Sequence, residues 1–431
     1  MFKPQEILGL IKGASFKGRV PKIILGISTD TRTIKAGELF IPLKGPKFNG
    51  RRFIHQALKK GAVALLVDDG LSALQALAAY HRSKFKIPII GITGSVGKTT
   101  TKDMLASILA QKFITLKNEE NFNNEIGVPL TLLKLTKKHR AAVIEMGMQG
   151  LGEIKLLAKL VRPHIAVITN IGEAHLAFLK TKKNIARAKA EIFKYLTPKD
   201  YAVINQDDEF FEHLKSKVSS IGGSLPVRQA GASGGKIKNS KIWSFGIIEK
   251  ADITPRALKG ITLPVPGEHN IYNALAAIAI AKILKINKLF IKTGLEKFRP
   301  SSKRMEIINR PDGVKIINDT YNASPSSMTA ALKVLAGTEG RKIALLGDML
   351  ELGRSTETFH KKIGGLARKL GIDILISIGK QSKAMRADYH IKNNRSALKL
   401  IKRLLHPGDV LLVKASRGMR LEEIVEAIRN I

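Results

Sequence analysis

The feature that most constrains the fold of this chain is a glycine-containing turn between an apolar strand and a helix. Residues 87–92 read as a buried strand, residues 100–111 as a helix, and the turn is Gly91-Ile92-Thr93-Gly94-Ser95-Val96-Gly97-Lys98-Thr99-Thr100. Such a turn directs backbone N–H groups and the positive helix end at phosphate oxygens. Position 92 is Ile where the usual loop has its first glycine, so we predict a variant P-loop. Lys98 is expected beside the β- and γ-phosphates, and the Thr99 hydroxyl on Mg²⁺.

Short apolar runs separated by helical segments recur after this loop. They lie at 141–144, 165–169, 314–317, 342–346, 373–377 and 410–413. This alternation is typical of parallel sheets covered by helices. No Gly-x-Gly-x-x-Gly motif follows a strand in the last four runs, which argues against a dinucleotide cofactor.

The residues before the P-loop read as a small mixed domain. Its expected segments are strands at 23–25, 39–41 and 62–67, a helix at 53–60 and a basic connector at 81–86. We therefore expect an α/β protein of three domains. These are a small mixed α/β domain (1–86), a central P-loop domain with a parallel sheet (87–300) and a Rossmann-like doubly wound domain (301–431). The Gly-, Ser- and Lys-rich residues 222–240 are expected to form an exposed loop or hairpin.

Two polar side chains follow strands of the central domain. Glu145 ends the run 141–144, and His175 lies just beyond the run 165–169. A carboxylate at the end of the strand beside a P-loop is suited to hold magnesium. His175 is expected at the same sheet edge, where a neutral imidazole can bind a divalent metal. A lone histidine is more often structural, and the spacing alone leaves both roles open for His175.

The charge balance raises a second class of function. The chain has 73 Lys and Arg against 35 Asp and Glu, a net charge of +38, which is a reason to consider nucleic-acid binding. The basic residues are scattered, however, and aromatic residues make up only 5%, whereas single-strand binders interleave both. We interpret the charge as a lysine-rich solvated surface that binds no specific nucleic acid.

The composition also indicates the cellular compartment of the protein. There are no cysteines, which excludes disulfides and thiolate metal sites and suits a reducing cytoplasm. No apolar run approaches the length of a membrane span, and the N-terminus lacks a signal-peptide pattern. We expect a monomeric cytoplasmic protein without a transmembrane segment.

A group of motifs along nearly the whole chain resembles the Mur ligase family in order and spacing. The central motifs are the P-loop, Asn121-Phe122-Asn123-Asn124-Glu125-Ile126-Gly127, Glu145-Met146-Gly147, Asn170-Ile171-Gly172-Glu173-Ala174-His175 and Gly267-Glu268-His269-Asn270-Ile271-Tyr272-Asn273. The C-terminal motifs are Asp319-Thr320-Tyr321-Asn322-Ala323-Ser324-Pro325, Gly347-Asp348-Met349-Leu350-Glu351-Leu352-Gly353 and Lys414-Ala415-Ser416-Arg417-Gly418-Met419.

The resemblance implies an ATP-dependent amide ligase of peptidoglycan precursor synthesis. The C-terminal motifs are similar to those of members that join D-alanyl-D-alanine to UDP-N-acetylmuramoyl-tripeptide through an acyl phosphate. Implied cofactors are ATP and two Mg²⁺ ions, and Lys189, fourteen residues after His175, is implied to be a carbamylated metal ligand. The implied metal ligands are Thr99, Glu145, His175 and Lys189, and the implied catalytic residues are Lys98, His175, Lys189 and Arg304.

The resemblance also implies binding residues. ATP contacts are expected from Gly94, Ser95, Val96, Gly97, Lys98, Thr99, Thr100, Asn270, Asn273, Arg304, Asp319, Tyr321 and Asn322. Substrate contacts are expected from Ser28, Thr29, Arg32, Lys44, Gly45, Asn121, Asn123 and Asn124. Two positions depart from the family: Lys303 stands where a glycine usually precedes the arginine, and Asn49-Gly50-Arg51 replaces the usual Asp-Gly-His.

Three other functions remain open. A sister ligase would add a different residue, such as a diamino acid. A folate or cyanophycin ligase would share the central domain but would not need the N-terminal domain. A nucleic-acid-binding P-loop ATPase would account for the charge of +38, and its binding would fall steeply with salt.

Overall fold

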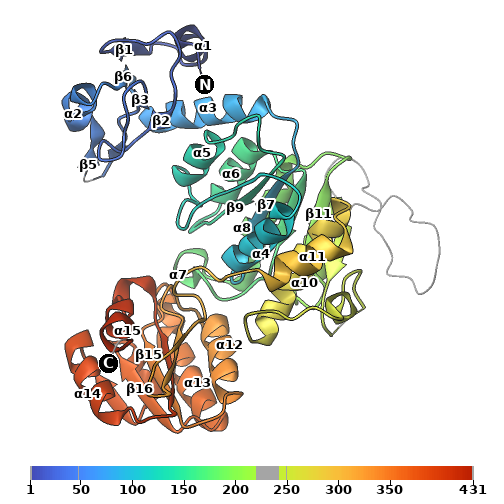
Figure 1. Ribbon diagram of the computed structural model, residues 1–431, viewed down its shortest axis with the longest axis vertical. Coiled ribbons are helices and arrows are strands. Elements are labelled where there is room, and N and C mark those ends of the chain that lie inside the picture. Colours follow the sequence, from blue (N-terminus) through green and yellow to red (C-terminus); the bar gives the residue numbers. More distant parts are fainter. Residues whose placement is uncertain (1, 47, 220–241, 249, 430–431) are drawn as a thin grey trace, which may run out of the picture.

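The computed structural model describes residues 2–46, 48–219, 242–248 and 250–429. Three larger sheets follow one another along the described part of the chain, and each lies within one of the three predicted spans (Figure 1). The three-domain α/β architecture is thereby confirmed, while the domain boundaries stay a prediction. The segment 222–240, expected to be a loop or hairpin, lies outside the described residues. No helix in the described part of the chain is long and apolar enough to cross a membrane.

The N-terminal unit contains a four-stranded sheet in the order β1-β6-β3-β2, with β1 antiparallel to β6 and the other pairs parallel. A short antiparallel pair, β4 and β5, lies beside it. The elements are α1 (Pro4–Leu10), β1 (Ser15–Lys17), β2 (Ile27–Ser28), β3 (Leu39–Phe40), β4 (Lys44–Gly45), β5 (Phe48–Asn49), α2 (Ile54–Lys59), β6 (Val63–Leu66) and α3 (Gly70–Ser83). The strand expected at 23–25 is reduced to a single bridge between Ile24 and Phe2.

The basic connector expected at 81–86 is wrong, because α3 continues to Ser83. His81 and Arg82 are buried in this helix. Arg82 donates hydrogen bonds to the backbone oxygens of Val161 (2.8 Å) and Arg162 (3.0 Å), at the end of a helix in the central unit. The helix thus joins the N-terminal and central units, and their buried side chains form one continuous cluster.

The central unit is a six-stranded parallel sheet in the order β12-β11-β10-β7-β9-β8. Its strands are β7 (Ile89–Thr93), β8 (Thr115–Lys117), β9 (Ala141–Glu145), β10 (Ile165–Ile168), β11 (Tyr201–Asn205) and β12 (Ile242–Phe245). Its helices are α4 (Lys98–Ala110), α5 (Gly127–Leu132), α6 (Glu153–Val161), α7 (Leu176–Leu179), α8 (Lys182–Ala190), α9 (Phe211–Ser219), α10 (Glu268–Ile283) and α11 (Lys288–Glu296).

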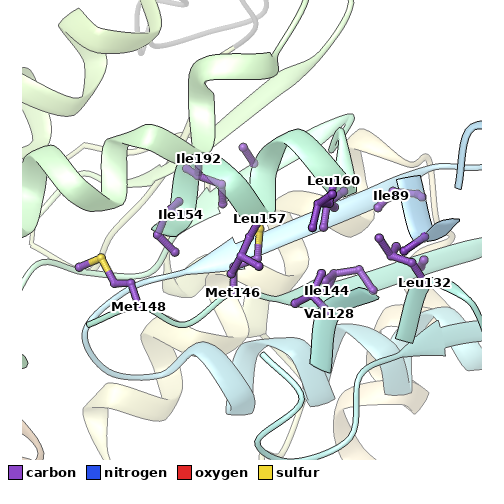
Figure 2. Packing of buried hydrophobic residues seen from close by; sticks show 14 of the residues in the cluster. Ile89, Val128, Leu132, Ile144, Met146, Met148, Ile154, Leu157, Leu160 and Ile192 are labelled. Carbon is purple, nitrogen blue, oxygen red and sulfur yellow. The ribbon is translucent and has the colours of Figure 1, made fainter. Parts of the chain in front are cut away.

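Alternate side chains of these strands point to opposite faces of the sheet, as the pleat requires. Ile89 and Ile144 pack toward α5 and α6, where Figure 2 shows Ile89 near Leu132 and Ile144 near Val128. Ile90 and its neighbours on the other face pack against α4, α10 and α11. Both faces are therefore covered, which explains why the strands read as continuous apolar runs.

The C-terminal unit is a second six-stranded sheet, in the order β13-β14-β18-β15-β16-β17, with only β13 antiparallel. The elements are β13 (Glu306–Asn309), β14 (Lys315–Asn318), α12 (Pro325–Ala336), β15 (Lys342–Gly347), α13 (Thr356–Lys369), β16 (Ile374–Ile378), β17 (Tyr389–Ile391), α14 (Asn394–Leu404), β18 (Val410–Lys414) and α15 (Glu422–Ile428). Helices α12 and α13 share one core cluster and α14 and α15 another, on opposite faces of the sheet. The doubly wound prediction is confirmed, although β13 and β17 were missed.

Candidate active site at the junction of two sheets

A cleft of about 840 Å³ lies between the carboxyl ends of the central and C-terminal strands. Most of the predicted site residues line it: Ser95, Val96, Gly97, Lys98, Thr99, Thr100, Asn121, Asn123, Asn124, Glu145, His175, Lys189, Asn270, Asn273, Arg304, Asp319, Tyr321 and Asn322. Some of them are far apart in sequence, such as Asn121 and Tyr321, which are 200 residues apart and whose side chains are hydrogen bonded. The fold thus brings together residues that the sequence could only assign one by one.

Backbone conformation explains two glycines of the P-loop. Gly94 has φ +153°, and a Cβ placed on it would lie 1.9 Å from Thr169 Oγ1. Gly97 has φ +84°, and its Cβ would lie 2.2 Å from Asn273 Oδ1. Because both contacts are far inside van der Waals distance, only glycine fits at these two positions. The loop is therefore held against β10 on one side and α10 on the other.

Lys98 begins α4 and curls back over the loop. Its Nζ donates hydrogen bonds to the backbone oxygens of Gly94 (2.8 Å) and Ser95 (3.3 Å). Burial lowers the pKa of Lys98, and the carboxylate of Glu145 opposes this shift. The cation is thus placed at the positive end of α4, where an anion is stabilised by helix and side chain together.

Thr99 and Glu145 form the acidic corner of the cleft. The Thr99 hydroxyl donates to Glu145 Oε2 at 2.7 Å, and Asn123 Nδ2 donates to the other carboxylate oxygen at 2.9 Å. Burial alone would raise the pKa of Glu145, but the positive charges of Lys98 and Lys102 outweigh it and hold this pKa below its usual range. Glu145 is therefore a buried, ionised carboxylate fixed beside a hydroxyl.

Lys189 ends up in the cleft wall although its sequence context resembles a surface helix. It is 1% exposed, and its Nζ donates to the backbone oxygen of Gly94 at 2.8 Å. Burial, and secondarily the charge on Lys98, lower the pKa of Lys189 well below the ordinary lysine value. Its amine is accordingly biased toward the neutral, nucleophilic form.

His175 is held by the C-terminal unit. Its backbone is left-handed (φ +66°), and its Nδ1 lies 2.7 Å from Glu351 Oε2. The backbone N–H of Ala177 also donates to the backbone carbonyl oxygen of Glu351 at 2.8 Å. The hydrogen bond from His175 lowers the pKa of Glu351 despite partial burial. Sequence reasoning did not assign Glu351 a role, although it belongs to a motif that follows β15.

Arg304 and Tyr321 form a second contact across the cleft. The Arg304 guanidinium carbon lies 3.6 Å from the centroid of the Tyr321 ring, and the Tyr321 hydroxyl donates to Asn121 of the central unit. Arg304 Nε is buried without a hydrogen-bond partner among the described residues. Lys303, just before it, has φ +64°, which is the conformation that favours glycine and agrees with the glycine that usually precedes the arginine in the family.

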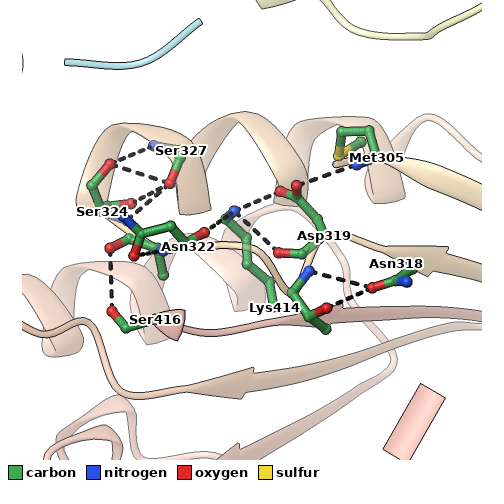
Figure 3. Close-up of polar contacts among 10 residues, drawn as sticks. Met305, Asn318, Asp319, Asn322, Ser324, Ser327, Lys414 and Ser416 are labelled. Carbon is green, nitrogen blue, oxygen red and sulfur yellow. Dashed lines mark hydrogen bonds and ion pairs between the residues drawn. The ribbon is translucent and has the colours of Figure 1, made fainter. Parts of the chain in front are cut away.

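A buried ion pair organises the loop after β14. Lys414, at the end of β18, lies 2.5 Å from Asp319 Oδ2 and donates to the Asn322 backbone oxygen at 2.7 Å (Figure 3). The backbone N–H of Met305 donates to the other Asp319 oxygen at 3.2 Å. Asp319 therefore acts within the loop rather than pointing freely into the cleft. Lys414 was missed, although its place at the carboxyl end of a strand could have identified it.

The two asparagines of α10 are linked to each other and to α4. Asn273 Nδ2 donates to Asn270 Oδ1 at 3.1 Å, and the Thr101 hydroxyl donates to Asn273 Oδ1 at 3.2 Å. Asn270 Nδ2 donates to the Pro266 backbone oxygen at 2.6 Å. Both asparagines line the cleft on the side of α10 that faces the P-loop.

The N-terminal residues predicted to bind substrate are not part of this cleft lining. Ser28 Oγ accepts from the Asp30 N–H at 3.1 Å, and Arg32 is paired with Asp30 at 2.6 Å while 85% of its side chain is exposed. Lys44 lines a separate cavity of about 500 Å³, together with Asn49, Arg51 and Asp69. Thr29 and Gly45 are in the same unit and are also absent from the cleft lining, and so is Gly94, although it belongs to the P-loop.

The donor set also bears on metal binding. Among the described residues no group of three or more His, Asp and Glu side chains could hold a metal ion by itself. Magnesium is commonly held by one or two carboxylates completed by phosphate oxygens and water. The ionised Glu145 beside the Thr99 hydroxyl, 2.7 Å apart, fits that requirement.

The chain is similar to known proteins over nearly its full length. Residues 23–94, 92–281 and 303–417 match family profiles described as Mur ligase family, catalytic domain; Mur ligase middle domain; and Mur ligase, glutamate ligase domain. UDP-N-acetylmuramoyl-tripeptide–D-alanyl-D-alanine ligase of Bacillus subtilis is 36% identical, covering 98% of this chain and 97% of the relative.

Solved structures show the same architecture. A crystal structure of MurF from Acinetobacter baumannii is 31% identical, with a TM-score of 0.87 over 99% of this chain and 98% of that chain. MurF ligase from Thermotoga maritima in complex with ADP has a TM-score of 0.79 at 24% identity, over 94% of this chain and 97% of that chain. At that identity the second likeness supports the fold alone.

Proposed function

This chain belongs to the Mur ligase family, and we propose that it joins D-alanyl-D-alanine to UDP-N-acetylmuramoyl-tripeptide with hydrolysis of ATP to ADP and phosphate. The observation that carries the proposal is the cleft itself. Its lining combines a P-loop, an ionised Glu145, the buried amine of Lys189 and Arg304 of the C-terminal unit. The full-length similarity to ligases of that name supports the choice of substrates.

ATP is the substrate for which the cleft is best suited. The N–H groups at the start of α4 and the Lys98 amine would bind the β- and γ-phosphates. Arg304 would approach from the C-terminal unit and offset the charge that gathers on the transferring group. Its Nε is already buried without a partner among the described residues, so a phosphate oxygen would supply the hydrogen bond it lacks.

Magnesium would be held by Thr99 and Glu145, and by a carbamate on Lys189. It supplies charge neutralisation on the phosphate oxygens when bound. The carbamate forms when the neutral Lys189 amine adds to carbon dioxide and releases one proton, which converts a neutral amine into an anionic oxygen ligand. The low pKa of Lys189 and its place 2.8 Å from the Gly94 oxygen favour this modification.

The reaction would proceed in two steps. The terminal carboxylate of the tripeptide attacks the γ-phosphorus, ADP leaves, and an acyl phosphate is formed. The neutral amine of D-alanyl-D-alanine then attacks the acyl carbon, loses a proton, and phosphate departs with one oxygen from the original carboxylate. Contacts between the units, such as His175 with Glu351 at 2.7 Å, would complete the site when the substrates are bound.

Phosphate release tests the proposal. The purified protein is incubated with ATP and Mg²⁺, then with the UDP-tripeptide and D-alanyl-D-alanine added singly and together. Release should require both organic substrates and equal the amount of UDP-pentapeptide formed. Release that needs neither of them would overturn the ligase assignment, and release with a diamino acid in place of the dipeptide would identify a sister ligase.

A further inference from the structure

Glu145 stands at the end of β9, beyond the point where that strand pairs with β8. The register between the two strands ends with Lys117 opposite Val143, two residues before Glu145. A carboxylate that is to hold magnesium must keep a fixed position, because the ion demands near-ideal octahedral geometry. The backbone of Glu145 therefore needs a partner on the β8 side that the strand pairing does not supply.

The side chain of Asn118 is that partner. Asn118 follows β8 directly and is 1% exposed. Its Oδ1 accepts a hydrogen bond from the Glu145 backbone N–H at 2.9 Å, and its Nδ2 donates to the Glu145 backbone oxygen at 3.0 Å. The same Nδ2 donates to the Phe122 backbone oxygen at 3.0 Å. A side-chain amide has two N–H donors, so both donors of Asn118 are used.

The loop that begins at Asn118 also carries one of the residues that hold the Glu145 carboxylate. The bond from Asn118 to Phe122 closes the turn that leads into Asn123, whose Nδ2 donates to Glu145 Oε1 at 2.9 Å. The Asn123 backbone oxygen in turn accepts from the Gly147 N–H at 2.8 Å. The residues on either side of this carboxylate are thus tied to the loop 118–123.

A buried lysine joins Asn118 to the P-loop helix. Lys102 is 2% exposed and lies three residues after Thr99 on α4, and its Nζ donates to the Asn118 backbone oxygen at 2.9 Å. Thr99 donates to Glu145 Oε2 at 2.7 Å, and the Lys102 amine lies 3.9 Å from that same oxygen. Helix α4, the residue after β8 and the end of β9 are thereby held together around the carboxylate.

We propose that Asn118 is a positioning residue for magnesium. It fixes the backbone of Glu145 and the loop that carries Asn123, and so sets the place of the carboxylate. This assignment deepens the proposed ligase function and rests on it. Asn118 is absent from the cleft lining, so it acts through Glu145 and touches neither ATP nor the ion. Outer-shell partners of this kind are worth about 10- to 100-fold in metal affinity.

Metal affinity, measured apart from turnover, tests the assignment. Mn²⁺ serves as the probe for Mg²⁺, and the free ion is titrated by electron paramagnetic resonance with ADP bound and both organic substrates left out. Asn118→Leu removes the three side-chain hydrogen bonds, and Asn118→Ala is used instead if the leucine variant does not fold. Asn118→Thr is the conservative variant, because its hydroxyl can accept from the Glu145 N–H.

Asn318→Leu is the matched control. Asn318 is also 1% exposed and lies at the end of a strand, β14, where its side chain bonds to Thr320 and Glu306. It is absent from the cleft lining. Each substitution of Asn118 is repeated in a Glu145→Gln background, and thermal melts record the stability of every variant.

We expect Asn118→Leu to weaken Mn²⁺ binding by about 10- to 100-fold, Asn118→Thr to weaken it less, and Asn318→Leu to leave it unchanged. In the Glu145→Gln background Asn118→Leu should add little, because the effects of residues that act through each other are not additive. Unchanged binding in Asn118→Leu, an equal loss in Asn318→Leu, or independent losses with Glu145→Gln would overturn the assignment. A wild type that binds Mn²⁺ but ligates no dipeptide would instead overturn the proposed function.

Discussion

The amine of Lys189 donates a hydrogen bond of 2.8 Å to the backbone oxygen of Gly94, the same P-loop oxygen that accepts from Lys98 at 2.8 Å. Two lysines on one carbonyl oxygen, inside a buried wall, are an unfavourable arrangement if both are charged. The arrangement therefore favours a neutral Lys189. Its conversion to a carbamate would place a negative charge close to the Lys98 ammonium, and these two groups attract each other.

Removing the amine should remove the carbamate and with it the activity. We expect Lys189→Ala to lose at least about 100-fold in kcat, because the anionic metal ligand is absent. Added acetate or propionate should restore part of the rate by occupying the same space. Steady-state phosphate release with and without these acids is the measurement, and failure of any short carboxylate to help would count against the carbamate.

Unmodified Lys189 should lower the free energy of unfolding. A pKa below the ordinary value of 10.5 in the folded state means that the unfolded chain binds the extra proton. The loss of stability from burying the Lys189 cation is complete when the pH is below the pKa of Lys189 in the folded protein. This loss disappears as the pH rises toward 10.5, the ordinary lysine value.

In carbon-dioxide-free buffer we therefore expect Lys189→Met to raise the melting temperature near pH 7, by about 2–4 °C per kcal/mol gained. The gap between variant and wild type should close near pH 10. Melting curves across this range decide the matter. A gap that stays constant with pH would mean that Lys189 keeps its charge on folding.

Glu145 should be needed for magnesium rather than for folding. Glu145→Gln keeps the shape of the side chain, and its amide oxygen can still accept the hydrogen bond from Thr99 Oγ1. In the wild type this bond is 2.7 Å long. We expect kcat to fall by about 100-fold or more and half-saturation to need more Mg²⁺, because a neutral amide is a poor ligand for a hard cation. A magnesium titration of ATP turnover, with a melt as control, would contradict the role if both curves matched the wild type.

Arg82 should matter for stability and not for chemistry. It donates to Val161 and Arg162 oxygens at 2.8 and 3.0 Å and to Phe85 O at 2.9 Å, and burial lowers its pKa to about 10. Arg82→Met would leave these buried oxygens unpaired, so we expect a loss of about 3 kcal/mol in the free energy of unfolding.

Denaturant unfolding measures this loss, with the exposed Arg395→Gln as a control expected within about 0.5 kcal/mol. Equal stability of the Arg82 variant and this control would show that the contact between α3 and α6 is not important for the fold.

The sequence correctly predicted those structures that depend only on residues close together in the chain. The strand, turn and helix around Gly94 and Gly97 were predicted because an apolar run and a helix start fix that geometry within a few residues. Arg82 was misread because a basic run looks solvent-exposed when its partners lie 79 and 80 residues away. The burial of Lys189 is likewise a tertiary effect, and only the family resemblance pointed to it.

The contacts made by the C-terminal unit were also beyond prediction from local sequence patterns. The pairing of Lys414 with Asp319 joins the ends of β18 and β14, and that of Glu351 with His175 joins two separate units. Neither partner is near the other in sequence, so no periodicity could predict the contact. The sequence showed that Lys303 replaces a glycine. Only the backbone conformation, with φ +64° at Lys303, shows why a glycine is favoured at that position.

The fate of one oxygen atom tests the mechanism most directly. The UDP-tripeptide is prepared with ¹⁸O in its terminal carboxylate and incubated with ATP, Mg²⁺ and D-alanyl-D-alanine, and the released phosphate is analysed by mass spectrometry. An acyl phosphate requires each phosphate to carry one oxygen from the carboxylate, so labelled phosphate should form in step with the amide. Unlabelled phosphate accompanying full amide formation would contradict the account.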